Sequence, residues 1–198
     1  MHLFFSHRLM RPEKWLGRLA AATRLFGRRD DGAILFEAAI VIPILLMMFL
    51  GMVEFSEAFT ARRRVATVAT TTADLVSQAT SVSTADLNDI VSVANSLLAP
   101  YSVSTLNVTI SSVGYDANSN VVSYWNCTWS NVSAAPTCAS PGTAPTLPTG
   151  LISAGQSIIV AQASYTFTPP IGQFLLGGVP FNSIAYYKPR FTLTVAMQ

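Results

Sequence analysis

The longest apolar stretch of the chain begins after Gly32 and ends at Val53, with the sequence AILFEAAIVIPILLMMFLGMV. As a helix rising 1.5 Å per residue it spans about 31 Å, which matches the roughly 30 Å hydrocarbon core of a bilayer. It exceeds the apolar core of a signal peptide, about 7–15 residues, and no small-x-small cleavage site follows it. The pattern therefore predicts a membrane-spanning helix.

The helical pattern continues beyond this stretch. No Gly or Pro occurs from Ser56 to Ala79, and apolar residues recur at steps of three and four, which is typical of one face of a helix. We therefore expect a single helix over residues 33–80, in which the membrane span extends into a long helix.

A second helix is predicted over residues 85–99. Ser83 or Thr84 can serve as its N-cap, Asp86 lies in its first turn, and Pro100 ends it. Its apolar positions fall on one face, and they are Leu87, Ile90, Val91, Ala94, Leu97 and Leu98.

After Pro100 the period of the pattern changes from 3.6 to 2, which indicates β-strands. Leu106, Val108 and Ile110 alternate with polar residues, and the Asp/Asn/Ser-rich residues 116–120 predict a hairpin turn. The segments expected to form strands are 103–113, 121–129, 157–168, 183–187 and 191–196, with a loop at 130–150. A long helix, a second helix and then antiparallel strands define an α+β chain. Its predicted parts are a basic leader (1–32), the transmembrane helix with its extension (33–80) and an exported α+β domain (81–198).

Charge predicts the orientation of the span. Residues 1–32 carry seven Lys or Arg and three Asp or Glu, whereas residues 33–198 carry five and seven. The positive-inside rule places the leader in the cytoplasm and exports the C-terminal part, although Arg62, Arg63 and Arg64 oppose this from the other side. The basic leader has no interleaved aromatic residues on a folded basic face, so it gives no reason to expect nucleic acid as a partner.

The only two cysteines, Cys127 and Cys138, lie eleven positions apart in a Pro-, Ser- and Thr-rich stretch. In an oxidising compartment such a pair most simply closes a disulfide loop over 127–138, and two free thiols are the alternative. A zinc site is disfavoured because it needs four ligands and only two are present.

The chain offers little material for catalysis. Both histidines, His2 and His7, lie in the leader, so histidine-dependent nucleophilic catalysis and His-ligated metals are not expected in the exported part. Asp116, Asn118 and Asn120 resemble the start of a calcium loop, but the required Gly and Glu are missing, so a plain turn is favoured. We expect no enzymatic activity, no metal and no cofactor.

One charged residue interrupts the apolar stretch. Glu37 is five positions after Gly32, and a carboxylate within the bilayer is costly. Either Glu37 lies close to the cytoplasmic interface, or the chain is cut between Gly32 and Ala33 so that Glu37 becomes its fifth residue. In the second case its carboxylate neutralises a new α-amino group when helices pack together.

Gly32-Ala33, Phe36-Glu37-Ala38, Pro43-Ile44-Leu45-Leu46 and Gly51-Met52-Val53-Glu54-Phe55 resemble the N-terminal signature of the TadE-like family of the tight-adherence (Tad) pilus system. The resemblance covers residues 32–61. It implies a non-enzymatic, pilin-like pseudopilin in the bacterial inner membrane that helps to assemble a Flp-type pilus. It also implies other Tad/Flp pilus assembly proteins and pseudopilins as partners, with a prepilin peptidase as the processing enzyme. TadG-like relatives keep their anchor uncleaved. Glu54, within the signature, is either a solvated residue or a contact between subunits.

Two other functions remain open at this point. An anchored module that binds cell wall or surface glycan is suggested by the aromatic residues of the exported strands, and exposure of these side chains would support it. Those residues are Tyr124, Trp125, Trp129, Tyr165, Phe167, Tyr186 and Tyr187. An anchored periplasmic enzyme is the third possibility, and it is weakened by the missing histidines.

Overall fold

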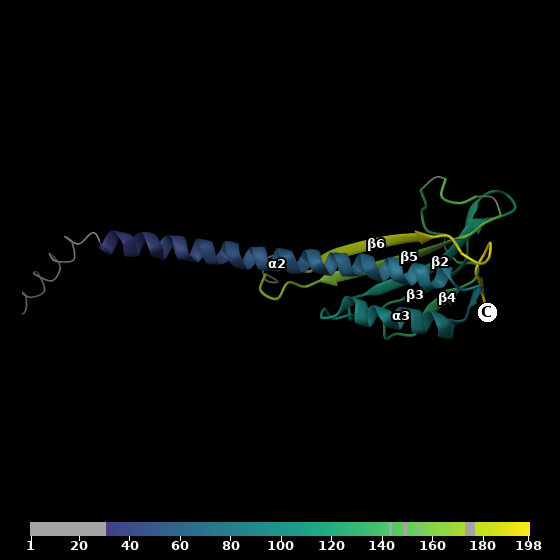
Figure 1. Cartoon of the computed structure of the whole chain (residues 1–198), viewed down its shortest axis with the longest axis horizontal. Coiled ribbons are helices and arrows are strands. Elements are labelled where there is room, and N and C mark those ends of the chain that lie inside the picture. The colour runs from purple at the N-terminus through teal and green to yellow at the C-terminus, as the bar shows by residue number, and fades with distance from the viewer. Residues whose placement is uncertain (1–30, 143, 149, 154, 173–176) are drawn as a thin grey trace, which may run out of the picture. The chain divides into compact units, whose positions relative to one another are not determined.

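The computed structural model describes residues 31–142, 144–148, 150–153, 155–172 and 177–198 (Figure 1). The predicted leader lies outside the described residues except for Asp31 and Gly32. The described chain divides after Leu50 into a helical N-terminal unit and a second unit, residues 51–198, here named the helix-and-sheet domain.

Helix α2, Asp31–Ser77, is a continuous helix of 47 residues that contains Pro43. It confirms the predicted long helix and ends at Ser77 rather than at residue 80. Among the described residues it is the one helix long and apolar enough to cross a membrane. In its first part large apolar side chains such as Leu35, Met47 and Phe49 are exposed.

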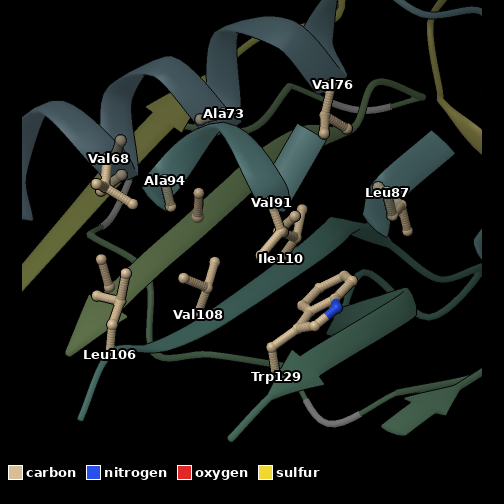
Figure 2. Close-up of a cluster of buried hydrophobic side chains, with 14 of the residues drawn as sticks. Val68, Ala73, Val76, Leu87, Val91, Ala94, Leu106, Val108, Ile110 and Trp129 are labelled. Atoms are coloured by element: carbon tan, nitrogen blue, oxygen red, sulfur yellow. The ribbon is translucent and has the colours of Figure 1, made fainter. Parts of the chain in front are cut away.

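The second part of α2 is amphipathic and supplies one wall of the core. Its buried side chains recur at helical spacing, whereas Phe59 and Thr67 on the opposite side are exposed. The buried apolar residues are Ala61, Val65, Val68, Ala69, Ala73 and Val76. Their side chains face the strands together with those of the second helix (Figure 2).

Helix α3, Thr84–Leu98, confirms the second predicted helix, and Ser83 is its N-cap. The Ser83 hydroxyl accepts a hydrogen bond from the Asp86 backbone N–H (3.2 Å), and the Asp86 carboxylate accepts one from the Ser83 N–H (2.8 Å). This reciprocal capping box satisfies two backbone donors that the helix leaves without partners. The buried residues of α3 are Leu87, Val91, Ala94 and Leu98.

Replacing Ser83 with alanine is expected to lower the free energy of unfolding by about 1 kcal/mol, because the N-cap acceptor is lost. Denaturant unfolding of the full-length protein in detergent measures the change. Ser92→Ala is the matched control, since the Ser92 hydroxyl donates to the Asp89 carbonyl within the same helix, and we expect it to change stability by less than about 0.5 kcal/mol.

The same cap is expected to be sensitive to acid. The backbone N–H of Ser83, followed by its hydroxyl, holds the pKa of Asp86 below the ordinary carboxyl value of 3.8. The stabilisation from this carboxylate is therefore present above that value and is lost as the pH falls through the lowered pKa of the folded state. The Ser83→Ala variant should lose less stability on acidification than the wild type. An equal or greater loss would contradict this assignment.

Five strands form one antiparallel sheet in the order β4-β3-β2-β5-β6. The strands are β2 (Asn107–Tyr115), β3 (Val121–Trp129), β4 (Thr137–Ala139), β5 (Ile158–Phe167) and β6 (Val179–Tyr187). Ile110 pairs with Cys127 on one side and with Ala161 on the other. The α+β class, the 116–120 hairpin turn and the four longer strands agree with the prediction.

Two details of the predicted strands were wrong. The segment 191–196 forms no strand of the main sheet. Of the apolar side chains that suggested one, Phe191 and Leu193 are exposed and only Val195 is buried. Instead the short β7 (Ala196–Met197) pairs in parallel with β1 (Ser81–Val82). The predicted loop 130–150 contains β4, which pairs with β3.

The core lies between the two helices and one face of the sheet (Figure 2). Leu106, Val108 and Ile110 point into it, as the alternating pattern predicted. The pairing of β2 with β3 shifts between Ser112 and Val113. Val113 belongs to a smaller cluster with Ile158 and Val160, against which the partly buried Leu147, Leu151, Ile152 and Tyr186 pack.

Candidate functional site

The predicted processing site lies in the first turn of α2. Gly32 is exposed, and a Cβ atom added to it would meet no other atom within 4 Å. Ala33 follows it in the same helix. A cut between these two residues would therefore leave almost the whole of α2, from Ala33 to Ser77, in the processed chain.

Glu37 lies one turn further along, and its side chain is exposed. Its neighbours Leu35, Phe36 and Ile40 are exposed as well, at 72, 71 and 51 per cent. Apolar side chains exposed to this extent over many turns are typical of contact with lipid or with other helices. Glu37 is therefore a single carboxylate on an apolar helix surface.

Glu54 has partners in its own chain. Its Oε1 atom accepts hydrogen bonds from the backbone N–H groups of Ile171 (2.7 Å) and Gly172 (2.5 Å). Two successive backbone donors converging on one carboxylate oxygen form a small anion-binding nest. Gly172 is buried, and a Cβ atom there would collide with the Glu54 carboxylate. Glu54 was predicted to be either a solvated residue or a subunit contact, and neither prediction included this contact within its own chain.

The three consecutive arginines of α2, residues 62–64, have different environments. Arg64 donates to the carbonyl oxygen of Leu97 (3.2 Å), near the C-terminal end of α3, where the helix dipole favours a cation. Arg62 and Arg63 are exposed, and the guanidinium of Arg63 lies 4.6 Å from the centroid of the Phe59 ring. Of these three arginines, Arg64 is therefore the one that donates a hydrogen bond within the domain.

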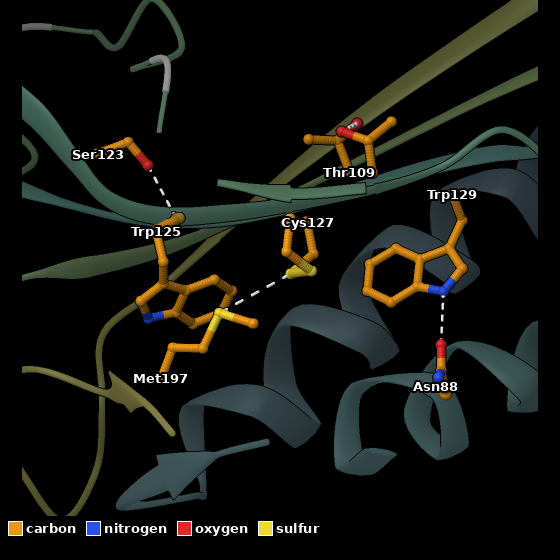
Figure 3. Close-up of a disulfide and its surroundings, with 9 residues drawn as sticks. Asn88, Thr109, Ser123, Trp125, Cys127, Trp129 and Met197 are labelled. Carbon is orange, nitrogen blue, oxygen red and sulfur yellow. Dashed lines mark hydrogen bonds between the residues drawn. A yellow bond between two sulfur atoms is a disulfide. The ribbon is translucent and has the colours of Figure 1, made fainter. Parts of the chain in front are cut away.

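Cys127 of β3 and Cys138 of β4 form a disulfide at directly paired positions of the sheet (Figure 3). The Sγ atom of the fully buried Cys127 contacts the Met197 Sδ at 4.0 Å. On either side of Cys127 along β3, the Nε1 of Trp125 donates to the Val195 carbonyl, and that of Trp129 donates to Asn88 Oδ1, both at 2.9 Å. The disulfide and both indoles thus stabilise the inner face of one strand.

Burial of the aromatic residues bears on the glycan-binding alternative. Trp125 and Trp129 are 2 and 0 per cent exposed, and Tyr165 and Phe167 are also buried. Tyr124, Tyr186 and Tyr187 are half-buried. The four buried rings are core residues, and the three half-buried ones pack against the core clusters. A stacking platform for sugars needs exposed rings, so this placement gives the glycan-binding alternative no support.

The remaining polar groups of the described residues form no metal centre. No group of three or more His, Cys, Asp or Glu side chains that could hold a metal was found among them. The Asp116 carboxylate accepts hydrogen bonds from Asn118 and Asn120 within the hairpin turn, and those from Asn120 are the main cause that lowers its pKa.

A surface hollow of about 350 Å³ is lined by residues 156–157 and 188–193. Arg190, on its rim, pairs with Asp74.

In the part of the chain that the structure describes, the fold and these sites define a class: one helix able to cross a membrane, which continues into an α+β domain. Residues 32–74 match the family model described as TadE-like protein. The chain is therefore TadE-like over residues 32–74, and the resemblance predicted from the sequence is confirmed. Searches among curated proteins and solved structures found no match.

Proposed function

We propose that the chain is a non-enzymatic TadE/TadG-like pseudopilin that is anchored in the bacterial inner membrane and acts in the assembly of a Flp-type (tight adherence) pilus. The observation that carries the proposal is the TadE-like match over residues 32–74, on a helix that exposes an apolar surface long enough to cross a bilayer. Its partners are other Tad/Flp assembly proteins and pseudopilins. The basic leader is cytoplasmic, and residues 81–198 form the exported, periplasmic part.

Processing gives Glu37 its role in this proposal. A prepilin peptidase cuts between Gly32 and Ala33, and the new α-amino group of Ala33 is paired with a Glu37 carboxylate of the same or a neighbouring subunit. Pairing removes two unpaired charges from the apolar surroundings, where each is costly. It also fixes the register of neighbouring helices, because a shift of one helix separates the pair.

The test is the N-terminus of the protein extracted from its native membrane, determined by intact mass and terminal peptide sequencing. A start at Ala33 is expected, and it should be lost in Gly32→Leu and in cells without prepilin peptidase. Gly51→Leu is the matched control, since Gly51 lies in the same helix with equally open surroundings. Glu37→Gln should still be cleaved and should fail to co-purify with the pilus assembly proteins.

A start at Met1 would overturn the processing step and the role of Glu37, and would leave a permanently anchored, TadG-like protein. Cleavage that persists in Gly32→Leu would move the processing site elsewhere. Robust hydrolysis of a cell-wall substrate by the purified chain would contradict the non-enzymatic assignment.

A further inference from the structure

The contact between Glu54 and the segment after β5 fixes the position of that segment along α2. Glu54 directly follows Val53, the last residue of the apolar stretch. Because its carboxylate binds the N–H groups of Ile171 and Gly172, this turn is held beside α2 at the point where the apolar stretch ends. The side chain of Ile171 is 54 per cent exposed there.

A stripe of exposed residues on α2 begins directly after Glu54. Phe55 and Phe59 are four positions apart, and Arg62 and Arg63 follow after three and four more, so that all four lie on one face of the helix. Phe55 and Phe59 are 74 and 47 per cent exposed, and both arginines are exposed. The stripe is thus apolar next to the membrane span and cationic further from it. It is named here, together with Ile171, the interfacial collar.

We propose that the interfacial collar lies in the headgroup region of the bilayer and binds anionic lipid, so that the domain rests on the membrane surface instead of being joined to it by the helix alone. The proposal rests on the membrane-anchored location proposed above. Each interfacial layer of a bilayer is about 5–8 Å thick, which corresponds to roughly four or five helical residues beyond Val53. Phe55, two residues beyond Val53, lies within that layer, and Phe59, six residues beyond it, lies about 9 Å along the helix, just outside the layer. The long side chains of Arg62 and Arg63 reach back to lipid phosphates.

The charges around the collar agree with a lipid partner. Arg64 is engaged by the Leu97 carbonyl, so Arg62 and Arg63 are the cations left for the membrane. The carboxylate that contacts the Ile171 backbone is that of Glu54, and it is bound by the N–H groups of Ile171 and Gly172. Glu54 is therefore a positioning residue, which acts on the membrane contact through the turn that it holds.

The experiment uses the full-length protein in vesicles of zwitterionic lipid or of zwitterionic lipid mixed with phosphatidylglycerol. A fluorophore is attached at Ile171→Cys, and quenching by lipids that carry a nitroxide near the headgroup is measured. Leu193→Cys is the matched control, because Leu193 is similarly exposed, at 64 per cent. It lies close to the far end of α2, where Arg190 donates its N–H to the Ser77 carbonyl, about 35 Å along the helix from Glu54 at 1.5 Å per residue.

Quenching several-fold stronger at position 171 than at position 193 is expected, with a further increase in the anionic vesicles. Glu54→Ala should reduce the quenching at 171 because it frees the turn, whereas Glu54→Gln should reduce it less, because an amide oxygen still accepts the two hydrogen bonds. Arg62→Gln with Arg63→Gln should abolish the difference between the two lipid compositions.

Three outcomes would count against the collar. Equal, weak quenching at both positions in a protein that resists carbonate extraction would overturn the collar and leave the membrane anchor intact. Quenching at 171 that is independent of phosphatidylglycerol would overturn the binding of anionic lipid. A protein that carbonate releases from the vesicles would overturn the anchor itself, and with it the proposed function.

Discussion

Replacing Trp129 with alanine is expected to lower the free energy of unfolding of the helix-and-sheet domain by about 3–5 kcal/mol, the range for removing a large aromatic side chain from a core. Trp129 is fully buried between β3 and α3, and its indole N–H donates to Asn88. The substitution leaves a cavity in the main core cluster. Denaturant unfolding of the full-length protein in detergent, followed by near-ultraviolet circular dichroism, measures the change.

Trp129→Phe separates packing from hydrogen bonding. It keeps an aromatic ring in the core and removes the N–H donor, so we expect a markedly smaller loss than for alanine. Asn88→Ala removes the acceptor. Because Asn88 is exposed, water can take its place at the indole N–H, so we expect a loss of only about 0.5–1.5 kcal/mol. A loss below about 1 kcal/mol for Trp129→Ala would contradict the placement of this side chain in a closely packed core.

Removing the disulfide is expected to cost about 3 kcal/mol, because the bond restricts the unfolded chain over the loop between Cys127 and Cys138. Cys127→Ala combined with Cys138→Ala is the variant to compare with the wild type by denaturant unfolding. Alanine is preferred to serine because Cys127 is fully buried and a hydroxyl there would lose its hydrogen bonds to water.

The loss should be concentrated in β4. This strand has three residues and pairs only with β3 at the edge of the sheet, so without the bond its amides should exchange with solvent sooner than those of β2. Cys138→Ala alone should behave like the double variant, since either one opens the loop. Equal stability of the oxidised and reduced wild-type protein would show that the bond does not stabilise the fold.

Local patterns were sufficient to predict much of this fold. Helix α3 could be read from its capping residues and apolar face, and the β2–β3 hairpin from alternation on either side of an Asp- and Asn-rich turn. Both depend on residues close together in the sequence. The segment 191–196 had the same alternation, yet Phe191 and Leu193 are exposed, because no strand lies beside this segment in the main sheet.

The contacts that were missed are those between distant residues. Glu54 is 117 positions from Ile171, and nothing around either residue indicates the other. Strands β1 and β7 have two residues each, and the paired Ser81 and Ala196 are far apart in the sequence, so neither strand has a pattern long enough to detect. Within the candidate site, Gly32 and Glu37 were predicted from a short local motif, and their role in processing stays a proposal, whereas the internal partner of Glu54 depends on the tertiary fold.

The two ends of residues 54–77 of α2 are each tied to the strand-bearing part of the domain. At one end Glu54 binds Ile171 and Gly172, and at the other the Ser77 carbonyl accepts from the Arg190 N–H while Asp74 pairs with the Arg190 side chain. Buried residues pack along the helix between them. A tensile load along α2 is therefore borne in shear by all these contacts together, whereas a load across the helix would peel them apart one after another.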